Sequence, residues 1–287
     1  MGLAKTIGSN KLEIAFILPL LIFIGFINIY PIFAAIISSF KLPSGYSLLN
    51  YQILVRNNNL YGVIGNTVLL TALALTIEFA LALATSLLLN RAIRGRSIFR
   101  TIVILPYGVS TVVSAIAFTF IFAPTGWYLN EIFNVLGLAH TQINWVRGPL
   151  AFLSIAIADS WKTFPIVMLI LLAGLQSIPE SQYEAAAVDG ASSLQQFRHI
   201  TLPGIYPFIM IALIIRAVQE FNILALPLVL VGYTPAFLGT LSFSIYETFV
   251  LGSQNLSSAA ATVLLAIVMI FIIVYVTISN RVTGGEE

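Results

Sequence analysis

Long apolar runs separated by short polar segments dominate the pattern of this chain. A helix needs about 20 apolar residues to cross the roughly 30 Å of hydrocarbon in a bilayer. A shorter, half-apolar run at 241–249 favours a short helix at the outer face over a further crossing. The pattern predicts an all-α, polytopic membrane protein with six transmembrane helices, at Ile14–Phe40, Val63–Leu89, Phe99–Phe122, Leu150–Leu175, Gly204–Leu230 and Leu256–Ser279.

One polar segment, residues 177–203, interrupts this pattern because it cannot lie in lipid, where a single charge at a helix centre costs roughly 2.5–3.5 kcal/mol. Ser177 to Glu180 has the spacing of a capping box, which starts a helix that runs to about Val188. Asp189-Gly190 then supplies the turn. Ser192 to Gln195 caps a second short helix, which we expect to end before Pro203. The segment therefore predicts a helix-turn-helix in water between two spans.

Composition and charge agree with a membrane protein and orient it. The chain of 287 residues is 59% hydrophobic and 8% charged, and its mean hydropathy is +0.99. By the positive-inside rule, both termini and the 177–203 segment are cytoplasmic. Most basic residues fall on one side of the alternation of spans, namely Lys5, Lys11, Arg91, Arg94, Arg96, Arg100, Arg198 and Arg281, against Lys41, Arg56 and Arg147 on the other.

The first apolar run is longer than the usual 7–15 residues of a signal peptide, so we expect an uncleaved first span in the cell membrane. Residues 1–12 are then a short cytoplasmic lead. Residues 13–287 are expected to form a single transmembrane domain.

Several classes of chemistry find no support in the sequence. Cysteine is absent, so neither a disulfide framework nor a thiolate metal site can be proposed. His140 stands alone and is interpreted as a surface residue. No G-x-x-x-x-G-K-[ST] motif occurs, and no nucleophile, base and orienting group converge at a readable spacing. We therefore expect no catalytic residue, metal or cofactor in this chain, and a membrane enzyme is the least favoured class.

The fourth and fifth spans carry charged residues at helical spacing, which gives each helix one polar face. Both polar faces must point into the protein rather than into lipid. Charges paired within each helix, Asp159 with Lys162 and Arg216 with Glu220, could simply hold the bundle together. The alternative is a polar cavity near the midplane, with Trp161 or a nearby aromatic residue free to stack on a ring, which suits a sugar. The residues at i, i+3, i+4 and i+7 are Asp159, Lys162, Thr163 and Ile166 on the fourth span and Arg216, Gln219, Glu220 and Ile223 on the fifth.

Glu78 lies close to the centre of the second span, where a carboxylate must face protein or water. A hydrogen bond between helices is the favoured interpretation. A role in a substrate or ion pathway is the alternative.

The polar segment resembles a known signature. Glu184-Ala185-Ala186, then Gly190, then Ile200-Thr201-Leu202-Pro203 after nine more residues, is similar to the EAA motif of permease subunits of ABC importers. The resemblance implies that the first helix of the segment is a coupling helix, which docks in a cleft of an ATPase subunit. The residues that would make this contact are Glu184, Ala185, Ala186, Asp189 and Gly190.

A second resemblance concerns the cargo. Asp159-Ser160-Trp161 with Pro165, Ala173-Gly174-Leu175-Gln176, Ile178-Pro179, and Phe221-Asn222 followed by Pro235 look like carbohydrate-uptake permeases of the maltose-transporter type. This family implies the fold of a type I ABC importer permease. It also implies that the eight residues of the two polar faces hold the sugar. The chain departs from the family by placing charges where polar or small residues are common, and by Gly232-Tyr233-Thr234-Pro235 where a Gly-Gly-Pro is usual.

The resemblance also implies partners. They are a second permease subunit, which we expect to be a different chain, a dimer of ATPase subunits that binds ATP and Mg²⁺, and an extracytoplasmic sugar-binding protein. Transport would follow alternating access.

Two alternatives stay open. One is an ABC permease for a phosphorylated polyol such as a glycerol phosphate, with Lys162 and Arg216 binding the phosphate. The other is an ion-coupled secondary transporter with Glu78 and Asp159 as ion sites, which leaves the EAA motif unexplained. The sequence leaves open which sugar is carried, whether the pore is heterodimeric, and whether this subunit holds the main substrate site.

Overall fold

The computed structural model describes residues 11–43, 45–57, 59–91, 95–124, 128–138, 142–232 and 239–283. The expectations for Lys5, Arg94, His140 and Tyr233–Pro235 lie outside these ranges, and so does most of the N-terminal lead. The chain forms two compact units, each described by itself below: Met1–Leu60 with Ser244–Ala266, and Tyr61–Phe243 with Ile267–Glu287. The expectation of a single domain over 13–287 stays a prediction.

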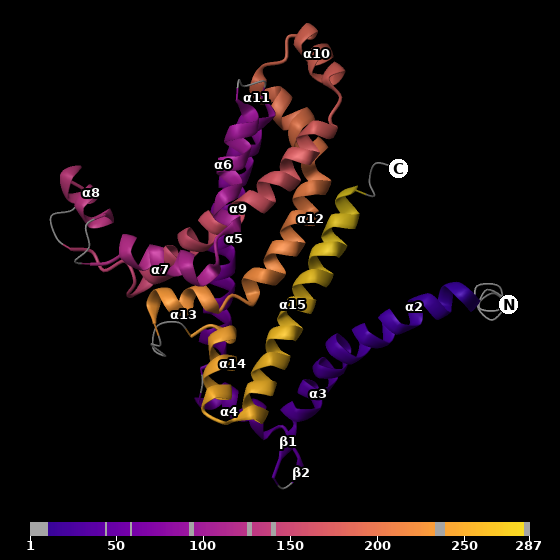
Figure 1. Ribbon diagram of the computed structural model, residues 1–287, viewed down its shortest axis with the longest axis vertical. Helices are drawn as coiled ribbons and strands as arrows, with labels where there is room; N and C mark the ends of the chain where they lie inside the picture. Colours follow the sequence, from indigo (N-terminus) through magenta and orange to yellow (C-terminus); the bar gives the residue numbers. More distant parts are fainter. Residues whose placement is uncertain are drawn as a thin grey trace. The chain divides into compact units, whose positions relative to one another are not determined.

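Helices make up nearly all of the described structure, which confirms the all-α class (Figure 1). The exception is a hairpin of two short strands, β1 (Lys41–Leu42) and β2 (Gly45–Tyr46), in which Lys41 pairs with Tyr46. The helices are α2 (Lys11–Ile24), α3 (Tyr30–Ser39), α4 (Leu49–Asn57), α5 (Leu60–Asn90), α6 (Arg96–Gly108), α7 (Thr111–Ile121), α8 (Leu129–Val135), α9 (Pro149–Ser177), α10 (Glu180–Val188), α11 (Ser193–Gln196), α12 (Leu202–Phe221), α13 (Ala225–Val231), α14 (Leu241–Val250) and α15 (Gln254–Thr283). π-Helical turns at Gly25–Ile29 and Phe197–Thr201 join α2 to α3 and α11 to α12.

Within the described ranges, five helical segments are long and apolar enough to cross a membrane, and a sixth crossing results if one bent pair of helices is a single span. The five are Phe16–Ser39, Leu60–Asn90, Pro149–Ser177, Ser193–Phe221 and Gln254–Ser279. They match five of the predicted runs. The shorter run at 241–249 is the short helix α14, as expected.

The third predicted span is not one straight helix. It is divided into α6 and α7, which meet at an angle of 95°, and Figure 1 shows α7 turned away from the direction of α6. Val109 between them has an extended backbone, and its N–H donates to the carbonyl of Pro106 at 3.2 Å. Pro106 and Gly108 explain the break, because proline removes a helical donor and glycine is a poor helix former.

The fifth predicted span ends earlier than Leu230. α12 stops at Phe221, where the side-chain amide of Asn222 donates to the carbonyl of Val218 at 2.7 Å. α13 is a separate short helix that packs along α7 and α9. Asparagine competes with the backbone for hydrogen bonds, so it favours helix ends.

The polar segment between α9 and α12 differs from the prediction at two points. The capping box at Ser177 is absent, because Ser177 still belongs to α9 and its hydroxyl donates to the carbonyl of Gly174 at 2.7 Å. The second helix does not end before Pro203 but runs on into α12. The π-helical turn makes this possible: Leu202 N–H reaches back to Phe197, and proline lies at the start of the α-helix that follows, where its missing N–H is tolerated. The capping box of Ser192 and Gln195 is confirmed.

In the first unit, polar side chains tie the hairpin to the helices on either side. Asn50 of α4 donates to the carbonyls of Ser39 at 2.8 Å and Lys41 at 3.2 Å. Leu54 packs against Ala259 and Ala260 of α15. Small residues allow this close approach of two helices.

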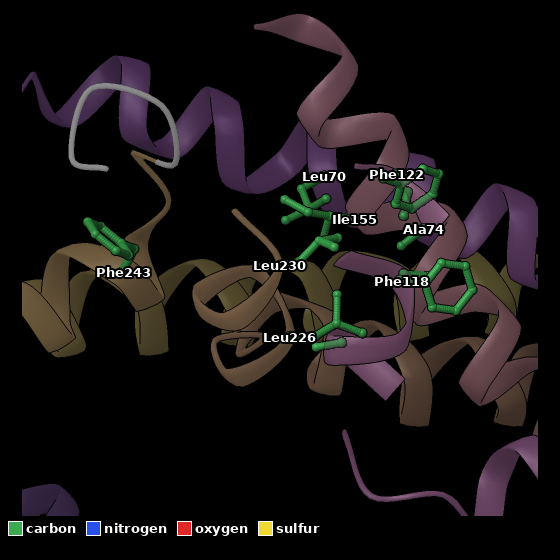
Figure 2. Packing of buried hydrophobic residues seen from close by; sticks show 11 residues of the cluster. Leu70, Ala74, Phe118, Phe122, Ile155, Leu226, Leu230 and Phe243 are labelled. Atoms are coloured by element: carbon green, nitrogen blue, oxygen red, sulfur yellow. The ribbon is translucent and has the colours of Figure 1, made fainter. Parts of the chain in front are cut away.

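In the second unit, a core of aliphatic and aromatic side chains joins α5, α7, α9 and α13 (Figure 2). It includes Leu70 and Ala74 of α5, Phe118 of α7, Ile155 of α9 and Leu226 of α13. A second cluster, around Met168 and Leu171 of α9, includes Ala212 of α12. Together these clusters fix the helices that carry the polar residues of the fourth and fifth spans.

Candidate functional site

Two acidic residues from different helices reach the same level because α5 and α9 are tied together there. The hydroxyl of Ser160 donates to the carbonyl of Ala74 at 2.9 Å, and both residues are buried. Asp159 is the neighbour of Ser160, and Glu78 lies one helical turn beyond Ala74. α12 also packs against α9, so three helices bring charge to one place.

Arg216 of α12 is the centre of this charge cluster. Its Nε donates to Glu78 at 2.7 Å and its Nη2 to Asp159 at 3.3 Å. Nη2 also pairs with Glu220, and Nη1 donates to the side chain of Gln219. Arginine has five N–H donors, so these four acceptors leave it little capacity to bind anything else.

The cluster is shielded from solvent, since Glu78, Asp159, Arg216 and Glu220 are all 1–6% exposed. The pairing of Arg216 with Glu220 and the helix-to-helix hydrogen bond of Glu78 are as predicted. The pairing of Asp159 with Lys162 is not, because Asp159 turns to Arg216 instead. A guanidinium bridges helices better than an ammonium because its planar donors reach several carboxylates at once.

Three members of the charge cluster, Asp159, Arg216 and Glu220, form one wall of a cavity of about 650 Å³. This volume falls within the range of roughly 300–1,000 Å³ typical of small-molecule sites. The lining residues are Tyr107, Thr111, Asp159, Lys162, Thr163, Arg216, Gln219, Glu220, Asn222, Ile223, Leu224, Ala225 and Leu226.

The structure brings together every residue of the two predicted polar faces except Ile166. Ile166 packs against the cluster around Met168 instead. Ile223 lines the cavity just beyond the end of α12. Thr163 also lines it, although its hydroxyl is held by the backbone carbonyl of Asp159 at 2.7 Å.

The aromatic residue at the cavity is Tyr107, not Trp161. Lys162 Nζ lies 5.6 Å from the centre of the Tyr107 ring, a cation–π distance. Trp161 instead packs edge-on against Phe118, with ring centres 5.5 Å apart. Tyr107 and Thr111 reach the cavity because the helix breaks between them, and the Pro106 and Gly108 flanking Tyr107 are the signal that could have located this break.

One carboxylate oxygen beside the cavity is left without a partner. Oε2 of Glu220 is buried and has no hydrogen-bond partner among the described residues. Buried polar atoms are normally satisfied. Glu220 would therefore have to turn toward the cavity to accept from a hydroxyl group of a bound molecule, whereas the Lys162 ammonium already lines the cavity and supplies a donor.

The predicted coupling residues lie together on α10 and the turn that follows it. Glu184, Ala185, Asp189 and Gly190 are exposed and Ala186 is half-buried. Gly190 has φ of +79°, and its N–H and that of Ala191 reach back to Ala187 and Ala186, which closes the helix with a Schellman turn. The segment is a protruding knob at one end of the second unit (Figure 1).

Two aliphatic side chains on this knob are unusually open to solvent. Val188 is 88% exposed and Leu194 is 75% exposed. The knob is anchored to the span below by a hydrogen bond of 3.0 Å between the hydroxyls of Tyr183 and Thr201. Exposed apolar groups beside charged ones, on a rigid turn, are typical of a protein–protein contact.

Comparison with known proteins identifies relatives along most of the chain. The trehalose/maltose transport system permease protein MalF of Thermococcus litoralis is 36% identical over 216 residues, which are 75% of this chain and 72% of that protein. The trehalose transport system permease protein SugA of Mycobacterium tuberculosis is 31% identical over 239 residues, 83% of this chain and 76% of that protein. A probable ABC transporter permease protein of Pyrococcus horikoshii is 32% identical and covers 96% of both chains.

Solved structures share the fold. A bacterial ABC transporter involved in the import of the acidic polysaccharide alginate matches with a TM-score of 0.84 at 24% identity, over 97% of this chain and 98% of that chain. A bacterial alginate ABC transporter in complex with an alginate pentasaccharide-bound periplasmic protein gives a TM-score of 0.84 at 23% identity, over 99% of each chain.

The model of one protein family matches residues 77–284, which include the charge cluster, the cavity and the α10 knob. The EAA resemblance is therefore confirmed at the level of the family. The chain belongs to the family of binding-protein-dependent transport system inner membrane components.

Proposed function

We propose that the chain is the permease subunit of an ATP-driven ABC importer that moves an uncharged sugar into the cell. The observation that carries the cargo is the cavity. Its wall holds two carboxylates and one amide that pair with Arg216, together with a lysine and a tyrosine. Sugars are recognised by such combinations, because their hydroxyl groups donate to carboxylates and their apolar ring faces stack on aromatic rings.

The proposed binding residues are Asp159, Lys162, Gln219, Glu220 and Ile223, with Tyr107 as the aromatic face. Arg216 orients the acidic and amide side chains, and Thr163 fixes the backbone of Asp159. Ile166 contributes packing in the neighbouring cluster. Support for a sugar also comes from relatives named as trehalose and maltose permeases.

The charge balance favours a neutral cargo over a phosphorylated polyol. With every group ionised, Glu78, Asp159 and Glu220 outnumber Arg216 and Lys162 by one negative charge. Arg216 could bind a phosphate only by releasing a buried carboxylate, which is costly. That leaves Lys162 alone for a phosphate, so the glycerol phosphate alternative loses its main support.

Energy would come from partner subunits. We infer that the α10 knob docks in an ATPase dimer that binds ATP and Mg²⁺, that a second permease completes the pore, and that an extracytoplasmic binding protein delivers the sugar. Closure of the ATPases would draw the knobs together and expose the cavity to the outside. Both termini and the knob would then be cytoplasmic, as the basic residues predict. Glu78 and Asp159 both form ion pairs with Arg216, which disfavours the alternative role of these two acids as ion sites.

The test of the cargo is competition for uptake by the complete transporter in proteoliposomes, with ATP inside. We expect unlabelled neutral sugars to compete with a labelled one and glycerol phosphate to have no effect. Glu220→Gln should lower uptake at least about tenfold, because a charged acceptor contributes roughly 1.5–3 kcal/mol. Glu131→Gln, at an exposed site on α8, is the matched control and should not change it. Competition by glycerol phosphate alone would contradict the proposal.

A further inference from the structure

Two positively charged residues lie away from the cavity, where α6 begins and α9 ends. Arg96 and Arg100 are one helical turn apart on α6, and the side-chain amide of Gln176 lies between them. With its oxygen toward the arginines, this amide accepts from Nη2 of Arg100 at 3.0 Å and from Nη2 of Arg96. A single neutral acceptor thus serves two guanidinium groups.

Neither arginine has a negative partner in the part of the chain that the structure describes. The ion pairs identified there join Arg216 to its three acids. The Nε–H groups of Arg96 and Arg100 are buried and lack an acceptor among the described residues. Two like charges that share one amide repel each other, and an anion bound beside them would offset this repulsion.

The start of α6 adds to the attraction for an anion. The helix has 13 residues, and Gly95 before it has φ of +80° and offers no side-chain cap. The N–H groups of Ile98 and Phe99 bond to the carbonyl of Gly95, whereas those of Arg96 and Ser97 have no side-chain partner among the described residues. The helix dipole places positive potential at the same end. Planar guanidinium groups beside such a helix end are well suited to a phosphate group.

The surroundings indicate that this phosphate belongs to a lipid. The opposite face of α6 is apolar and open: Ile98, Phe99, Ile102 and Leu105 are between 52% and 67% exposed. Arg96 begins α6 and Arg100 lies one turn further along, so both lie at the end of the helix where its apolar surface begins. Lipid phosphates occupy this depth at the edge of the hydrocarbon.

We propose that Arg96, Arg100 and the start of α6 bind the phosphate of an anionic phospholipid, with Gln176 as a neutral spacer. The site would link α6 to α9 only four residues before α10 begins. Bound lipid would therefore steady the base of the α10 knob, and the lipid composition of the membrane would influence transport. The proposal does not depend on which cargo is carried.

The experiment measures lipid retention by the complete transporter in a neutral detergent, by native mass spectrometry during titration with phosphatidylglycerol or phosphatidylcholine. We expect the wild type to prefer phosphatidylglycerol and Arg96→Gln/Arg100→Gln to lose this preference by roughly tenfold or more. The matched control Arg91→Gln/Arg198→Gln removes the same charge from exposed sites and should stay within about twofold of the wild type.

Gln176→Glu tests the site without removing either arginine, and it serves if the double glutamine variant does not fold. The new carboxylate supplies the missing anion within the chain, so it should abolish the preference for phosphatidylglycerol. Equal retention in Gln176→Glu and the wild type would overturn the proposal, as would an equal loss in the control variant. Displacement of the lipid by millimolar inorganic phosphate would assign the site to a free phosphate instead.

Discussion

Arg216 is the residue on which the buried charges of the second unit depend. It neutralises part of the charge of Glu78, Asp159 and Glu220. Removal of one partner from a buried ion pair is strongly destabilising, because the other charges stay buried without compensation. The cluster is thus a structural requirement as well as the wall of the cavity.

We predict that Arg216→Gln lowers the free energy of unfolding by about 3–5 kcal/mol. Thermal unfolding of the purified subunit or complex in detergent would show this as a clear fall in Tm. Lys162→Gln is the control, because Lys162 lies over an aromatic ring rather than in an ion pair, and its cost should be about 1 kcal/mol or less. Equal stability of both variants would contradict the account of the cluster.

At this scale the sequence predicted which residues are polar and inward-facing, and it predicted the pairing of Arg216 with Glu220 within one helix, but not the pairs between helices. Helical spacing alone places Asp159 beside Lys162, since periodicity describes one helix at a time. The bridge from Arg216 to Glu78 and Asp159 joins helices far apart in the chain, and no local pattern contains it. Ile166 shares the helix face of Thr163 by spacing, yet it packs against the cluster around Met168.

Close contact between α9 and α12 positions the two polar faces. A Cβ added to Gly174 would come within 2.7 Å of the Phe208 ring, and one added to Gly204 within 2.7 Å of Ile178 Cδ1. The aromatic ring of Phe208 packs against the cluster around Met168 and has little room to move. The end of the Ile178 side chain, in contrast, can rotate away. Glycine at position 174 is therefore needed for the approach of the two helices.

Gly174→Ala should destabilise the protein by about 1–3 kcal/mol, as overpacked cores do. Gly65→Ala on α5 is the matched control, because nothing lies within 4 Å of the added Cβ, and alanine is the better helix former. Thermal unfolding of both variants would measure this difference in stability. A stable Gly174→Ala beside an unstable Gly65→Ala would contradict the packing.

Elements were predictable where the apolar run was long and uninterrupted, as in α5 and α9. The prediction was wrong where a helix break or a π-helical turn changed the course of the backbone. Pro106 and Gly108 break a run that hydropathy alone presents as continuous, and a π-helical turn carries a helix across Pro203, where proline normally marks an end. Both differences between prediction and structure have the same cause. Hydropathy is averaged over many residues, whereas one proline or glycine can change the backbone hydrogen bonds that set the direction of a helix.

On the scale of the whole molecule, we propose that the chain, which has no ATP-binding motif of the G-x-x-x-x-G-K-[ST] kind, works with a partner ATPase through the α10 knob. Family membership covers the knob and the cavity together, and the exposed Val188 and Leu194 give the knob an apolar contact surface. In this proposal the cavity would recognise the cargo and the knob would provide the contact with the ATPase. Neither is sufficient for transport without the other.

The most direct test is to purify the chain from native membranes in mild detergent and measure which proteins accompany it, for the wild type, Glu184→Lys and the control Glu180→Lys. Both substitutions reverse a charge at an exposed position of α10. The account predicts that an ATPase and a second permease accompany the wild type and the control, that Glu184→Lys loses the ATPase, and that only complexes with the ATPase take up sugar with ATP. A chain that purifies alone and drives uptake from an ion gradient without ATP would contradict it.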